Sequence, residues 1–73
     1  MAGRGAKRLR AWRKKMGLSQ LAAASVLEVP QGRLSEWERG LRRPGRLNAV
    51  RIEKRTAGLV PVEAWDDLAR KAS

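Results

Sequence analysis

The chain of 73 residues contains no cysteine and no histidine. Disulfides, thiolate nucleophiles, imidazole bases and the usual zinc ligands are therefore excluded. Phenylalanine and tyrosine are also missing, which leaves three tryptophans as the only aromatic residues. No apolar run is long enough to cross a membrane, and no signal-peptide core follows the basic start. We expect a cytoplasmic protein without a metal or other cofactor, and not a zinc finger.

Positive charge dominates the residues that are present. Seventeen Lys and Arg against seven Asp and Glu give a formal charge of +10. Charge of this sign attracts a polyanion, either a nucleic acid or an anionic membrane surface. The first fifteen residues carry seven basic side chains and no acid, whereas the segment after Pro61 is slightly acidic. The length predicts one small domain over residues 1–73, with a flexible basic arm at residues 1–5.

Apolar residues recur at three- and four-residue spacing, and the alternation typical of strands is missing, which predicts an all-α fold. We expect five helices, over residues 6–16, 20–27, 30–39, 47–57 and 61–73. Leu9, Trp12 and Met16 would share one face of the first helix. Ser19 is placed to cap the second helix, and Pro30 suits the first turn of the third. The last helix carries an apolar stripe that we expect to serve partly as core and partly as a dimer interface: Val62, Trp65, Leu68 and Ala69.

Residues 17–40 contain a pattern of known spacing. Leu18-Ser19-Gln20, Ala24, Leu27, Val29, Leu34 and Trp37-Glu38-Arg39-Gly40 resemble the lambda-repressor-like helix-turn-helix family, which includes phage repressors and xenobiotic-response-element regulators. The likeness extends over residues 7–59. It implies a compact five-helix DNA-binding domain with its helix-turn-helix in the second and third helices.

Packing physics explains the residue types of this pattern independently. Ala24 is small enough for two helices to cross closely, and four larger apolar residues would then fix the crossing angle: Leu27, Val29, Leu34 and Trp37. The resemblance further implies that Glu38 pairs with a basic residue of the first helix, and Arg13 stands at the matching position. We interpret all of these residues as structural.

In this architecture the third helix enters the major groove of DNA. Its exposed positions are the expected base contacts: Gln31, Gly32, Arg33 and Glu36. Arg33 can donate twice to guanine, and Gln31 can pair with adenine. Glu36 either accepts from cytosine or pairs within the helix with a neighbouring arginine. Gly32 either permits close approach of the backbone to DNA or is neutral.

A second group of residues is expected to contact phosphate. Gln20 resembles the phosphate-binding glutamine of the family, at a helix N-terminus that favours anions, and Ser19 can add its amide. Arg42, Arg43 and Arg46 lie in the loop where the family contacts the DNA backbone, although generic solubilising charge is the alternative. The arm at residues 1–5 would follow the backbone, enter the minor groove, or stay disordered.

Two positions depart from the family pattern. Glu28 stands where the turn usually has glycine, so it must accept a left-handed conformation or reshape the turn. Ala23 replaces a larger aliphatic residue, which loosens the core unless Trp12 or Trp65 fills the space.

These features predict a sequence-specific regulator of transcription that binds double-stranded DNA. The expected form is a phage-type or autoregulatory repressor, bound as a homodimer to an inverted repeat and associated with the nucleoid. The nearest alternative is an antitoxin that holds a toxin through the last helix. A membrane-active protein is disfavoured by the internal acids and helix stops, and an RNA-binding or architectural protein would discriminate little among duplexes. No catalysis is expected, because the serines lack a histidine partner.

Overall fold

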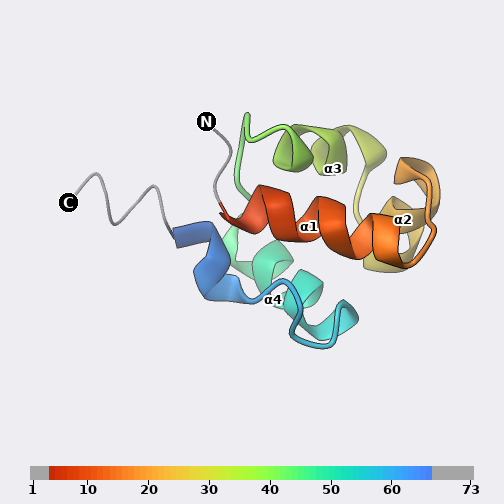
Figure 1. Cartoon of the computed structure of the whole chain (residues 1–73). Helices are drawn as coiled ribbons and strands as arrows, with labels where there is room; N and C mark the ends of the chain where they lie inside the picture. The colour runs from red at the N-terminus through yellow and green to blue at the C-terminus, as the bar shows by residue number, and fades with distance from the viewer. Residues whose placement is uncertain (1–3, 67–73) are drawn as a thin grey trace.

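The computed structural model describes residues 4–66 as four α-helices and a short 3-10 turn. The helices are α1 (Arg4–Lys15), α2 (Gln20–Leu27), α3 (Gln31–Glu38) and α4 (Arg46–Arg55), and the 3-10 turn is η1 (Val62–Asp66). Figure 1 shows α1 crossing the middle of the molecule, with α3 on one side and α4 on the other. α2 packs against both α3 and α4, and η1 packs against α1 and α4. The described residues contain no strand, so the all-α prediction is confirmed for them.

The expected count of five helices is not confirmed. The fifth segment, as far as the structure describes it, is the 3-10 turn η1, which ends at Asp66. This turn packs into the chain's own core, because Ala64 is 2% exposed and Trp65 is 7% exposed. Leu68 and Ala69, the other half of the expected apolar stripe, lie outside the described residues.

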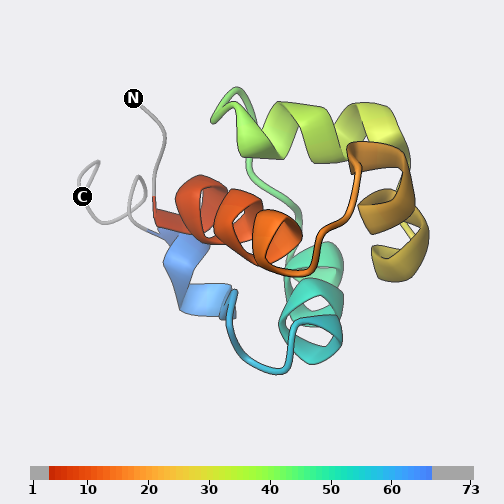
Figure 2. The same ribbon diagram turned by 45° about the vertical axis from the view of Figure 1, so that its right-hand side comes forward.

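The core lies between the four helices, all of which contribute buried apolar residues to it, and Figure 2 shows α3 and α4 on opposite sides of α1. Every residue that the sequence assigns to the helix crossing is buried: Ala24, Leu27, Val29, Leu34 and Trp37. Ala23 is also fully buried, in one cluster with Trp12 and Trp65. The two indoles that the sequence analysis offers to fill the space around Ala23 therefore belong to the same core cluster as Ala23.

The end of α1 corrects one expectation. Met16 was expected on the same face as Leu9 and Trp12, but it lies in the turn beyond Lys15 and is 58% exposed. Gly17 ends the helix with a φ of +70°, and its amide donates to the carbonyl of Lys14. Glycine adopts this conformation without a steric penalty, so the chain leaves the helix one residue too early for Met16 to turn inward.

The starts of the other helices follow the sequence within a residue or so. The Ser19 hydroxyl accepts a hydrogen bond from the Ala22 amide at 3.1 Å, which confirms its capping role for α2. Pro30 is the residue just before α3, where its missing amide costs nothing. α4 begins at Arg46, after Gly45, and no side chain caps its N-terminus.

Two residues of the predicted arm lie in a helix. Arg4 and Gly5 already belong to α1, and Gly5 is buried beneath Trp65. A Cβ atom placed on Gly5 would come within 2.3 Å of Cε3 of Trp65. Residues 1–3, the remainder of the expected arm, lie outside the described residues.

Candidate nucleic-acid interface

The turn between α2 and α3 sets how α3 is presented. Glu28 adopts the left-handed conformation with φ 60° and ψ 44°, the first of the two options that the sequence left open. Two arginines of α4 hold it there, because Arg51 donates to the Glu28 carbonyl at 3.2 Å and Arg55 pairs with the Glu28 carboxylate. The contacts with α4 offset part of the cost of a non-glycine residue at this position.

A buried ion pair fixes the other end of α3. Glu38 is 2% exposed, and its carboxylate accepts two hydrogen bonds from Arg13, at 2.7 Å from Nε and 3.0 Å from Nη2. The hydrogen bond with Glu38 raises the pKa of Arg13 above its ordinary value, and charge attraction adds to this effect while burial opposes it. The third donor of Arg13 binds the Leu18 carbonyl at 3.1 Å. α1, the start of α2 and α3 are thereby joined, and the expected structural pair is present.

The outer face of α3 carries the expected base-contacting residues. Gln31, Gly32 and Arg33 are exposed, and Glu36 keeps 32% of its side chain exposed. Glu36 faces Arg33 at 3.3 Å and Arg42 at 3.7 Å. The sequence left two roles open for Glu36, a base contact or a pair with an arginine of the same helix. In the free protein Glu36 forms the pair, with Arg33. These are exposed pairs of small energetic value, so both partners can exchange them for a ligand.

No internal requirement explains the glycine on this face. A Cβ atom on Gly32 would meet no atom within 4 Å, and the residue does not need a positive φ. Pro30, Gly32, Arg33 and Glu36 line an open hollow of about 420 Å³. The backbone of α3 is therefore more accessible here than an ordinary side chain would leave it.

The expected phosphate-contacting residues lie at the ends of neighbouring elements. Ser19 directly precedes α2, and Arg42, Arg43 and Arg46 follow α3 on exposed positions. Arg43 donates to the Trp65 carbonyl at 3.4 Å, which ties the loop to η1. Gln20 is half-buried, and its amide donates to Glu38 at 3.3 Å. In the free protein Gln20 thus belongs to the Arg13–Glu38 network, with one further N–H available.

Three structural residues escaped the sequence analysis. Arg51 and Arg55 support Glu28 from a distance of 23 and 27 residues along the chain, respectively, and no local pattern indicates such a contact. Thr56 is buried, donates to the Ile52 carbonyl at 2.8 Å and accepts from the Val60 amide at 3.1 Å. Thr56 thereby links α4 to the segment that follows it, and no local sequence pattern indicates this role.

The described part of the chain includes no helix that is both long and apolar enough to cross a bilayer. A model of the helix-turn-helix family matches residues 9–57, which is more than half of the chain. Neither a curated protein nor a solved structure matched it. The family match covers α2, α3 and α4 completely and α1 from Leu9 onward, so it includes the buried ion pair and the exposed face of α3. The chain belongs to the lambda-repressor-like helix-turn-helix family and is a DNA-binding regulator of transcription.

Proposed function

We propose that this protein represses transcription as a homodimer on an inverted-repeat operator, in the manner of a small phage-type or autoregulatory repressor. The observation that carries the proposal is the outer face of α3, where Gln31, Arg33 and Glu36 project from a helix fixed at both ends. A rigid helix with polar side chains of this kind suits the major groove, where arginine reads guanine and glutamine reads adenine.

Gly32 supports close docking of α3. Because neither packing nor backbone conformation requires glycine there, the absence of a side chain favours direct approach of the helix to base edges or sugar. On this proposal Arg42, Arg43 and Arg46 contact the DNA backbone from the segment that follows α3, and Ser19 and Gln20 contact it from the N-terminal end of α2. On this proposal the protein acts in the cytoplasm, at the nucleoid, and we assign it no catalytic role.

Dimerisation is proposed because one domain of this size reads only half of a typical site. A two-fold dimer would place its two copies of α3 about 34 Å apart on one face of the duplex. Several large apolar side chains lie at the surface, among them Leu47 at 85% exposure, Leu21 at 66% and Leu41 at 62%. Exposed apolar side chains of this kind can be buried when a second chain packs against them. Val62 is half-buried, and with Leu68 and Ala69, which lie outside the described residues, it stays part of the interface that we propose from the sequence.

Selection of bound duplexes from a random pool tests this function. We expect the enriched sequences to contain an inverted repeat, and we expect two chains per duplex when stoichiometry is measured on the winner. A scrambled duplex of equal length is the control for binding by charge alone, since that component falls with salt equally for both. Equal affinity for the selected and scrambled duplexes would reject sequence-specific repression in favour of an architectural role.

An antitoxin is the second candidate, supported by Val62 at the start of the last segment, which is only half-buried within the chain. On this proposal the chain represses its own operon and neutralises a toxin through residues 61–73. The neighbouring gene decides between the two. We expect an antitoxin's neighbour to arrest growth when expressed alone and to be neutralised by this chain, whereas a harmless neighbour favours the simple repressor.

A further inference from the structure

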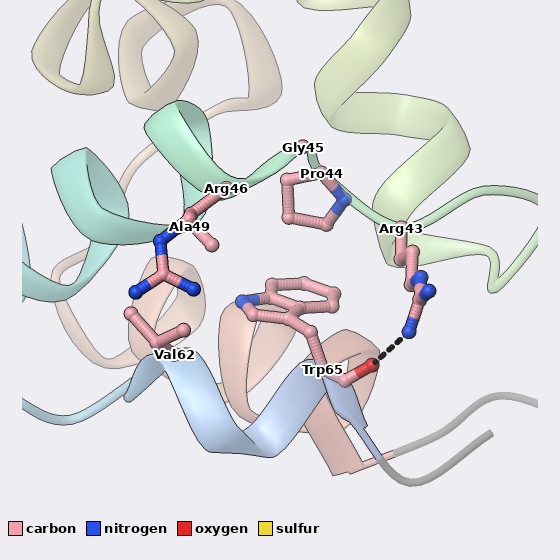
Figure 3. A pocket seen from close by; sticks show the side chains of 7 residues that line it. All are labelled: Arg43, Pro44, Gly45, Arg46, Ala49, Val62 and Trp65. Carbon is pink, nitrogen blue, oxygen red and sulfur yellow. Dashed lines mark hydrogen bonds between the residues drawn. The ribbon is translucent and has the colours of Figure 1, made fainter. Parts of the chain in front are cut away.

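A cavity lies between the loop after α3 and the turn η1. It has a volume of about 290 Å³ and is lined by residues from the loop, the start of α4 and η1: Arg43, Pro44, Gly45, Arg46, Ala49, Val62 and Trp65 (Figure 3). The lining contains two arginines and no acid. Its electrostatic character therefore favours an anion.

Trp65 carries an unused hydrogen-bond donor at this cavity. Trp65 is 7% exposed, and its Nε1 is the one buried side-chain nitrogen or oxygen of residues 4–66 for which no hydrogen-bond partner is found. A buried donor without a partner is uncommon, because its desolvation is not compensated. In Figure 3 the nitrogen-bearing edge of the indole faces the side on which the Arg46 guanidinium lies. An acceptor brought by a ligand at this position would satisfy it.

The N-terminus of α4 adds donors to the same cavity. Gly45 precedes this ten-residue helix and no side chain caps it, so its first amides keep their capacity to bind an acceptor. Arg46 is exposed and its side chain can move aside to admit a ligand to the indole edge. Arg43 stays anchored to the Trp65 carbonyl on the opposite side.

We infer that this cavity binds one phosphate group, and that Trp65 Nε1 donates a hydrogen bond to a phosphate oxygen held by Arg46 and the α4 N-terminus. Trp65 lies beyond the segment that matches the family, so this role is a property of the chain's own C-terminal turn. The inference rests on the proposed function only where the phosphate belongs to DNA. A free phosphate would use the same donors and would compete with the duplex.

The indole N–H resonance of Trp65 in the ¹⁵N-labelled full chain provides a direct test. It is identified by its loss in Trp65→Phe and then followed in two titrations, one with inorganic phosphate and one with the selected duplex. Movement with duplex alone assigns the site to backbone phosphate. Movement with inorganic phosphate, together with displacement of duplex, assigns it to a free anion. In the phosphate titration the Trp12 and Trp37 resonances should stay in place.

Two variants with matched loss of charge locate the effect. Arg46→Gln should raise the phosphate concentration that half-saturates the Trp65 shift about tenfold, as expected for loss of a charged hydrogen-bond donor. Lys54→Gln, on the exposed surface of the same helix and away from the cavity, should leave it unchanged. A Trp65 resonance that stays fixed in both titrations while the duplex still binds overturns the inference and leaves the proposed function standing. Failure to bind any duplex instead rejects the proposed function. The phosphate titration alone then decides whether the cavity binds phosphate.

Discussion

The guanidinium of Arg13 on α1 and the carboxylate of Glu38 on α3 meet in a two-pronged ion pair, with Nε 2.7 Å from Oε2 and Nη2 3.0 Å from Oε1. Glu38 is almost fully buried and Arg13 keeps 17% of its side chain exposed. The pair joins two helices that are distant in sequence, at the base of the helix proposed to read DNA. Its first consequence concerns stability.

Replacing Arg13 with Met should destabilise the fold, because it leaves the Glu38 carboxylate buried without its main partner. We expect a loss of about 2–3 kcal/mol in the free energy of unfolding, somewhat below the value for pairs that are wholly buried. Because folding raises the pKa of Arg13, the ion pair contributes its full stability at neutral pH. That contribution is lost only when the pH rises above the ordinary pKa of arginine. Urea unfolding measures the loss. Lys14→Met on the exposed side of α1 is the control, and equal losses in both variants would contradict the assignment.

The strained turn at Glu28 gives a second prediction. Glu28→Gly removes the left-handed strain, whereas Glu28→Ala keeps it, and both remove the pair with Arg55. The glycine variant should therefore be more stable than the alanine variant by about 1 kcal/mol. Thermal unfolding of the two proteins measures this difference directly. If alanine proved equal to glycine, position 28 would have to leave the left-handed region in the variants.

These two sites show which features of the structure can be predicted from the sequence and which cannot. The helix spacing, the Ser19 cap and the buried apolar residues follow from local periodicity, which acts over one or two turns. The left-handed option at Glu28 was foreseen because one residue type conflicts with one backbone position. Its support by Arg51 and Arg55 was not, because contacts across more than twenty residues depend on how whole helices pack. The same holds for Trp65, whose neighbour Gly5 lies at the opposite end of the described chain.

The division between base and phosphate contacts predicts different responses from two arginines. Arg33→Ala should relax the preference at one base position in each half-site, at a cost of about 1–3 kcal/mol for the preferred base. Arg43→Ala should weaken all duplexes alike and lower the slope of log affinity against log salt by about one. Repeating the duplex selection and the salt titration with both variants measures these effects. An unchanged motif with Arg33→Ala would remove Arg33 from the base contacts.

Two helical glycines give the sharpest test of the packing, because the same substitution should change stability in opposite directions. Alanine is favoured over glycine within a helix by about 0.5–1 kcal/mol when the added methyl group has space. Gly32 on α3 has that space, so Gly32→Ala should stabilise the free protein by this amount. At Gly5 on α1, the added Cβ would lie 2.3 Å from the Trp65 ring, which must shift to admit it.

Gly5→Ala should accordingly destabilise the fold by about 1–3 kcal/mol, the usual cost of forcing an extra carbon into a packed core. Chemical unfolding of both variants gives the two signs in one experiment. Gly5→Ala in a Trp65→Leu background serves as the control, since its cost relative to Trp65→Leu alone should be smaller if the indole is the cause of the clash. Stabilisation by alanine at both glycines would mean that η1 does not hold Trp65 against the start of α1. The cavity proposed to bind phosphate would then lack its indole wall, because that wall requires Trp65 to be packed against Gly5.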